Sequence, residues 1–196
     1  MGKAAATRQM ILQKAFALIY TKGYQATSID DILATTQVTK GAFYYHFKNK
    51  DDMGLALIAE VLKPVMQEQF TGPLSATDDP ATTIYVMIEQ LLLHEPMLEL
   101  AYGCPVGNLT QEMAPWNDEF SQALEELTAL WKHTLEDAIV QGQKSGKIDA
   151  GVVPQQVSAF VISGYWGVRN LGKLYKDKKV YYAFLHELKQ YLQGLK

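Results

Sequence analysis

The chain has 196 residues, of which 48% are hydrophobic and 20% are charged. This composition is that of an ordinary globular protein with enough length for a sizeable core. No run approaches the roughly 18 uncharged apolar residues of a membrane span, and the first ten residues lack an apolar signal core. We therefore expect a soluble, cytoplasmic protein without membrane contact. The single cysteine excludes an intramolecular disulfide and a multi-cysteine zinc site.

Charge is distributed unevenly along the chain. Residues 1–50 carry seven Lys/Arg and two Asp, whereas residues 51–196 carry eleven Lys/Arg and nineteen Asp/Glu, within an overall net charge of −3. A small basic segment joined to an acidic body is typical of a protein whose one end meets a polyanion such as nucleic acid.

Helical periodicity predominates from the start of the chain, and strand signals are nearly absent, which predicts an all-α fold. Apolar residues at i, i+3 and i+4 predict a first helix over 7–22, with Gly23 as its stop. Thr27 and Ser28, followed by Asp30 and Asp31, predict a capped second helix that ends near residue 35 or 36.

A third helix is predicted from Thr39, its N-cap, to about Phe47. A longer helix begins near residue 51, where Asp51 and Asp52 suit a helix N-terminus, and continues beyond Leu62. Pro64 is interpreted as a kink or a stop in it. Long helical patterns follow, separated by loops in the segments TGPLSATDDP, YGCPVGN and KSGKIDAGVVP.

The first three helices have the order and tight turn of a helix-turn-helix, whose second helix enters the major groove of DNA. Phe43 and Phe47 share one face of the third helix, which predicts that this face is buried. The opposite face then presents small residues and hydroxyl donors to base edges and phosphates. This predicted surface comprises Lys40, Gly41, Ala42, Tyr44 and Tyr45, with His46, Lys48 and Lys50 at its rim. The alternative is a short solvated helix whose aromatic residues pack against a neighbour.

The segment VTKGAFYYHFKNKDDM resembles the tetracycline-repressor (TetR) family of one-component bacterial regulators, and the resemblance covers roughly residues 7–62. It implies a DNA-binding domain over 1–50 and a helical ligand-binding and dimerisation domain over 51–196. The expected DNA-contacting residues also include the N-cap Thr39 and the small Gly41, which departs from the larger residues that some family members carry at this position. It further implies that phosphates are held by Thr27, Ser28, Tyr45, His46 and Lys50, and that bases face Lys40, Ala42 and Tyr44.

After residue 62 the resemblance concerns architecture, with GCPVGNL as a similar junction between loop and helix. Large apolar residues at helical spacing pack the core in most proteins. A pocket lined by such groups with a few polar handles would nevertheless suit a small, mostly apolar effector. The candidate lining residues are Tyr85, Ile88, Leu92, Tyr102, Asn108, Met113, Phe120, Leu124 and Trp131.

Two C-terminal segments carry apolar residues at spacings of three and four, which predicts a homodimer closed by a four-helix bundle. The alternative is that both faces pack against the chain's own body. The predicted interface residues are Val157, Val161, Gly164, Val168, Leu171, Phe184, Leu188 and Tyr191.

Catalytic and metal-binding patterns are weak. GQKSGK is one residue short of a phosphate-binding loop, and Ile148 replaces its Ser or Thr. The four histidines are dispersed, and Cys104 has no evident base. We therefore expect no metal, no cofactor and no enzyme. The predicted function is a repressor that a small molecule releases from a palindromic operator in double-stranded DNA. The alternatives are a regulator whose effector acts as a co-repressor and, from another class, a helical enzyme or small-molecule carrier with an incidental helix-turn-helix.

Overall fold

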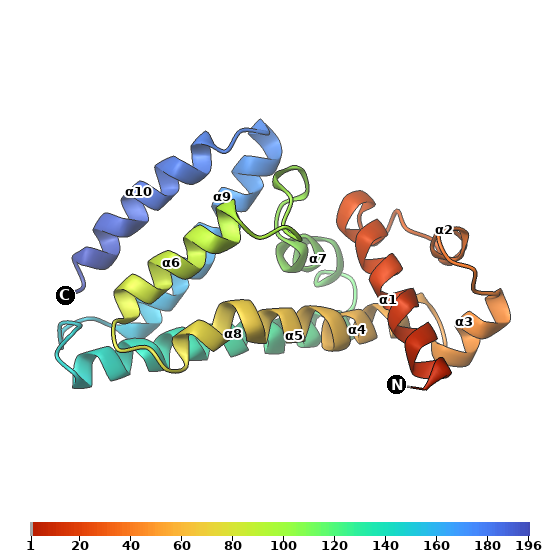
Figure 1. The fold of residues 1–196 in the computed structure, drawn as a ribbon, viewed down its shortest axis with the longest axis horizontal. Coiled ribbons are helices and arrows are strands. Elements are labelled where there is room, and N and C mark those ends of the chain that lie inside the picture. Colours follow the sequence, from red (N-terminus) through yellow and green to blue (C-terminus); the bar gives the residue numbers. More distant parts are fainter. Residues whose placement is uncertain (1) are drawn as a thin grey trace. The chain divides into compact units, whose positions relative to one another are not determined.

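The structure is a computed structural model that describes residues 2–196, and every regular element in this range is helical (Figure 1). The chain forms two compact units, both of which are discontinuous in sequence. The first unit holds residues 1–64 and 106–127, and the second holds 65–105 and 128–196. The predicted domain boundary after residue 50 falls inside the first unit.

The first unit begins with α1 (Lys3–Lys22), α2 (Ile29–Ala34) and α3 (Lys40–His46), followed by α4 (Lys50–Leu57). α1 starts four residues before the predicted position and ends at Gly23, whose φ of 96° is a conformation that favours glycine. The core of this unit contains Ile11, Leu12, Ala15, Ile32, Phe43, Phe47, Met53 and Leu57.

Pro64 does not stop the helix that precedes it, so of the two predicted alternatives, a kink or a stop, the stop is wrong. A π-helical segment, η1 (Ile58–Leu62), follows α4 directly, and Lys63 N–H donates to Ile58 O five residues earlier. The winding is wider here than in an α-helix, which gives room for a proline ring that would otherwise meet the carbonyl four residues before it. The helix then continues as α5 (Lys63–Met66) and η2 (Gln67–Thr71).

Helices from the middle of the chain complete the first unit. α7 (Pro105–Met113) begins inside the segment predicted as the loop YGCPVGN, and α8 (Asp118–Lys144) contributes its first turns. The Phe120 ring meets the Tyr24 ring edge to face, with centroids 5.0 Å apart. Gly54 lies against both rings, and a Cβ there would come within 2.5 Å of Phe120.

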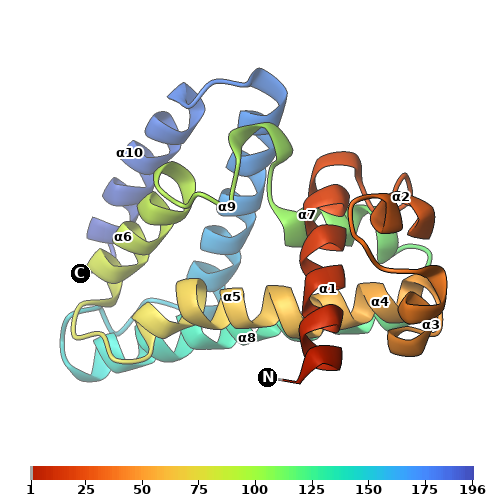
Figure 2. The ribbon, with the colours of Figure 1, turned by 45° about the vertical axis from the view of Figure 1, so that its right-hand side comes forward.

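The second unit contains the rest of α8 with η3 (Gly72–Leu74), α6 (Pro80–Leu93), η4 (Leu100–Tyr102), α9 (Pro154–Tyr175) and α10 (Lys179–Gln193). α10 packs against both α6 and α9, as Figures 1 and 2 show. Phe70, Trp131 and Tyr165 form a cluster of edge-to-face rings in its core, with centroids 4.9–5.7 Å apart. Among residues 2–196 no helix is both long and apolar enough to cross a bilayer.

Candidate nucleic-acid interface

α2, the helix that precedes the recognition helix α3, starts with a reciprocal cap. Asp31 N–H donates to Ser28 Oγ at 3.0 Å, and Ser28 N–H donates to Asp31 Oδ2 at 2.9 Å. The Ser28 hydroxyl also donates to Asp31 Oδ2 at 2.6 Å, and this bond, followed by the one from Ser28 N–H, holds the pKa of the Asp31 carboxyl below its usual range. The sequence-predicted capping box is therefore present.

α3 has one buried and one open face, as its sequence predicts. Thr39 caps it by accepting from Ala42 N–H at 3.2 Å. Phe43 and Phe47 are buried, whereas Tyr44 and Tyr45 are 48% and 78% exposed. A Cβ added at Gly41 would meet no atom within 4 Å, so the outer surface is open around this glycine. An accessible face of this kind, with a glycine near its start, suits close approach to base edges.

Lys40 lies at the start of this face with its ammonium 3.3 Å from Asp30 Oδ1. Both side chains are largely exposed, so the pair is weak and is easily exchanged for another anion.

Two of the predicted phosphate anchors are engaged inside the first unit. Thr27 is 1% exposed, and its hydroxyl donates to Gly23 O at 2.7 Å. Lys50 Nζ donates to Tyr24 O at 3.0 Å and to Thr27 O at 3.1 Å, and it lies 4.5 Å from the centroid of the Tyr24 ring. Ser28 and Tyr45 remain exposed, and His46 is half-buried.

Tyr24 and Arg8 are structural residues that the sequence reasoning missed. The Tyr24 hydroxyl donates to Lys50 O at 3.0 Å and to Asp51 Oδ1 at 2.6 Å. Burial, followed by this bond to Asp51, raises the pKa of Tyr24. The Arg8 guanidinium pairs with Glu60 at 2.6 Å, and this hydrogen bond raises the pKa of Arg8 despite the opposing effect of burial. In the sequence, Arg8 is one of the seven basic residues of residues 1–50, and no nearby residue type marks its partners.

The residues predicted to line an effector pocket are distributed over both units. Ile88, Leu92 and Trp131 are buried in the second unit, where Tyr85 is half-buried and donates to Glu89 Oε1 at 2.9 Å. Tyr102 lies in η4 of the same unit. The other four predicted residues belong to the first unit, and three of them are buried there: Met113, Phe120 and Leu124 are buried, and Asn108 is half-buried.

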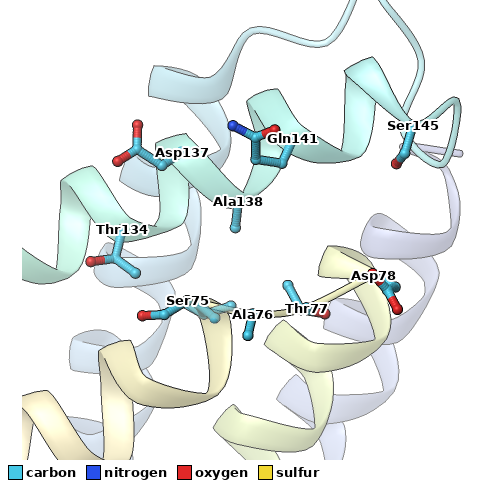
Figure 3. Close-up of a pocket in the computed structure, with 10 residues that line it drawn as sticks. Ser75, Ala76, Thr77, Asp78, Thr134, Asp137, Ala138, Gln141 and Ser145 are labelled. Atoms are coloured by element: carbon cyan, nitrogen blue, oxygen red, sulfur yellow. The ribbon is translucent and has the colours of Figure 1, made fainter.

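Two cavities of the second unit have linings that include none of these nine residues. One, of about 800 Å³, lies between the segment after η3 and the C-terminal half of α8, and its lining is polar, with Asp78, Asp137 and Gln141 (Figure 3). The other, of about 480 Å³, lies between η2, η3 and α6. Its apolar lining residues are Pro73, Val86, Met87 and Leu91, and its polar ones include Glu68, Gln90 and Glu95.

Four of the predicted dimer-interface residues are buried within the single chain: Val157, Val161, Val168 and Leu188. Of the rest, Gly164, Phe184 and Tyr191 are half-buried and Leu171 is exposed. The free apolar face of α9 is instead a neighbouring stripe with heptad spacing. We call it the outer stripe, and it consists of Phe160, Gly164, Gly167, Leu171 and Leu174.

α10 borders the outer stripe. The Phe160 and Tyr191 rings have centroids 4.1 Å apart, and a Cβ at Gly164 would come within 2.8 Å of the Phe184 ring. A larger residue at this position would therefore require the Phe184 ring to shift.

Arg169 is a buried charge that the sequence reasoning also missed. Its side chain is fully buried, and its guanidinium donates to Leu98 O at 3.0 Å, to Glu99 O at 3.1 Å and to Gly103 O. It therefore ties α9 to the segment that contains η4. Among the described residues no cluster of three or more His, Cys, Asp or Glu side chains has the arrangement of a metal site.

Comparisons with known proteins match both parts of the chain. The model of bacterial regulatory proteins of the tetR family matches residues 11–57, and that of the tetracyclin repressor-like C-terminal domain matches residues 75–188. The HTH-type transcriptional repressor DhaR of Mycobacterium sp. (strain GP1) is 25% identical over 179 residues, which cover 91% of this chain and 88% of DhaR.

Two further relatives agree with these matches. An HTH-type transcriptional regulator in the lacX 3′ region of Lactococcus lactis is 37% identical over 121 residues, which span 62% of this chain and 62% of that regulator. The crystal structure of a TetR-family transcriptional regulator from Cytophaga hutchinsonii superposes with a TM-score of 0.89 at 21% identity, covering 100% of this chain and 98% of that one.

Proposed function

The chain belongs to the TetR family of bacterial regulatory proteins and is a DNA-binding transcriptional regulator, not an enzyme; we propose that it is a homodimeric repressor that a small molecule releases from a palindromic operator. The observation that carries this proposal is the open face of α3, held in place by its cap and by two buried phenylalanines. As a regulator of genes, it would act in the cytoplasm.

DNA recognition by this surface divides between bases and phosphates. Lys40, Ala42 and Tyr44 would face bases, and Gly41 would let the helix approach them closely. Ser28, Thr39, Tyr45 and His46 would hold phosphates, since they lie at helix starts or at the edge of the open face. Thr27 and Lys50 would support this surface without holding a phosphate themselves. Their polar groups already donate to backbone carbonyls of the turn between α1 and α2.

The outer stripe of α9 supports dimerisation. Its spacing of four and three residues is that of helices that pack along a common seam, and Leu171 and Leu174 are 44% and 71% exposed in the single chain. We propose that this stripe, bordered by Phe184 and Tyr191, packs against its symmetry mate. Two recognition helices related by a two-fold axis would then read the two halves of a palindrome.

We place the effector in the second unit. The cavity between η2, η3 and α6 supports this assignment, because its volume of about 480 Å³ and its largely apolar lining suit a small, mostly apolar molecule. An inducer must bind the DNA-free state more tightly, and a co-repressor the DNA-bound state.

The test is selection of DNA from a random pool by the purified protein. A repressor of this class should enrich a palindrome and bind it at nanomolar concentration, far more tightly than a scrambled duplex. Enrichment of no sequence would overturn the proposal of a palindromic operator. Once an operator is known, small molecules are screened for those that raise the melting temperature of the protein, and these are added to the protein–DNA complex. Release of DNA identifies an inducer, and tighter retention identifies a co-repressor.

A further inference from the structure

One guanidinium joins three elements of the first unit. Arg8, on α1, donates from Nε to both Glu60 carboxylate oxygens at 3.1 and 3.2 Å and from Nη2 to Glu60 Oε1 at 2.6 Å. Its Nη1 donates to His46 O, in the last turn of α3, at 2.8 Å. The guanidinium also lies 4.4 Å from the centroid of the Phe47 ring. Arg8 therefore connects α1 and η1 to the end of the recognition helix.

The end of α3 depends on such a partner. The helix has seven residues, and a helix of that length is not stable by itself in water. It ends at Phe47, in extended conformation and without a glycine cap. Phe47 N–H donates to Phe43 O, and the carbonyls that follow Phe43 need partners from outside the helix. Arg8 supplies one to His46 O, and its positive charge suits the negative end of a helix.

Glu60 fixes the direction in which Arg8 points. Its carboxylate accepts three hydrogen bonds from Arg8 and one more from Gln9 Nε2 at 3.1 Å. The two side chains are 31% and 33% exposed, so water screens the pair only in part. Glu60 lies in the π-helical segment, and its carboxylate reaches Arg8 from this wide turn.

We propose that Glu60 and Arg8 are positioning residues for sequence-specific DNA recognition. Glu60 orients the Arg8 guanidinium toward His46 O, and the pair thereby fixes the orientation of the base-reading face of α3. The inference rests on the proposed operator binding. Neither residue contacts a base in this role.

The substitution Glu60→Gln separates this role from simple electrostatics by the sign of its effect. Removing a carboxylate from a DNA-binding unit should strengthen binding to any duplex, because repulsion of phosphates falls and Arg8 is released. If the pair positions α3, Glu60→Gln should instead weaken binding to the selected operator by roughly tenfold or more. Binding to a scrambled duplex of equal length should be unchanged or stronger.

Arg8→Lys provides a second variant that keeps the charge. A lysine can reach one partner but lacks the fork that binds a carboxylate and a carbonyl together, so the operator should again lose affinity relative to the scrambled duplex. Gln9→Ala is the matched control, since it removes a hydrogen bond to the same carboxylate and leaves the bond from Arg8 to His46 O in place. It should change the ratio of the two affinities by less than about twofold. All titrations are made at a temperature at which circular dichroism shows each variant folded.

The outcomes are distinct. If the wild-type protein selects no operator, the proposed function fails and this inference fails with it. If an operator is selected and Glu60→Gln binds it as tightly as the wild type, or more tightly, only the positioning role is overturned. An equal loss on both duplexes also overturns it, because the pair would then serve folding alone.

Discussion

Lys40 is the residue whose substitution should change sequence preference. Its ammonium is exposed, pairs weakly with Asp30, and lies at the start of α3, where it can reach guanine acceptors in the major groove. We expect Lys40→Ala to cost about 1–3 kcal/mol of operator binding and to relax the preference at one position. Titration against single-mismatch operators checks this. Equal losses on cognate and mismatched DNA would make Lys40 a phosphate anchor.

Lys50 should behave differently because its ammonium binds two backbone carbonyls of its own unit. Lys50→Ala leaves both carbonyls without this donor, so we expect the free energy of unfolding to fall by about 1–3 kcal/mol and all DNA sequences to bind more weakly in equal proportion. Lys48→Ala is the control, since Lys48 is exposed. Denaturant unfolding of both variants gives the comparison, and an unchanged stability for Lys50→Ala would contradict the internal role.

At the scale of elements, caps decide where the short helices begin. Thr39→Ala removes the oxygen that accepts from Ala42 N–H, which should cost about 1 kcal/mol. Since α3 is short, part of that loss should appear as weaker operator binding. Thr39→Ser keeps the capping oxygen and should retain both stability and binding. Comparison of the two variants by thermal unfolding and operator titration tests the cap, and equal behaviour of Ala and Ser would count against it.

The start of α6 should make stability depend on pH. Asp79 accepts from Thr82 N–H at 3.1 Å and from Lys196 Nζ at 2.9 Å, and the hydrogen bond from Lys196 holds the pKa of Asp79 below the ordinary value of 3.8. A carboxyl with a lowered folded-state pKa stabilises the fold above its unfolded pKa, and this contribution is lost as the pH falls through the folded pKa.

Asp79→Asn keeps a capping oxygen but cannot ionise. We therefore expect it to be less stable than the wild type at neutral pH, with a difference that disappears in acid below the folded-state pKa. Urea unfolding from pH 7 downward measures this difference. A constant difference over the whole range would show that the ionised carboxylate is not responsible.

For the whole molecule, the outer stripe predicts which substitutions separate the dimer. Leu171→Glu puts a carboxylate on an exposed position of α9, so the single chain should still fold, while burial of two unpaired charges at the interface costs several kcal/mol. We expect a folded monomer with lost operator affinity in sedimentation and DNA titration. Val86→Glu, also at an exposed apolar position but on α6, should remain a dimer.

Val161→Glu should instead unfold the chain, because Val161 is 1% exposed within it. The difference between Leu171→Glu and Val161→Glu distinguishes the outer stripe from the buried stripe of Val157, Val161 and Val168. A folded monomer from Val161→Glu together with an intact dimer from Leu171→Glu would reverse the assignment.

The amino-acid sequence by itself determined the helical class, the caps at Ser28 and Thr39, the buried pair Phe43 and Phe47, and the family resemblance of the first 62 residues. These features are local. A cap depends on residues three positions apart, and a helix face depends on residues three and four positions apart. Both can therefore be predicted from the sequence without knowledge of the tertiary structure.

Only the tertiary structure decided which apolar stripe of α9 is free, where Arg8 and Lys50 point, and that residues 106–127 join the first unit. Two neighbouring stripes of α9 are apolar, and periodicity cannot show which of them the chain covers itself. Arg8 and Lys50 donate to backbone carbonyls 38 and 23–26 residues away. A backbone carbonyl is present at every residue, so no residue type marks it as the partner, and only the packing of distant helices brings donor and acceptor together.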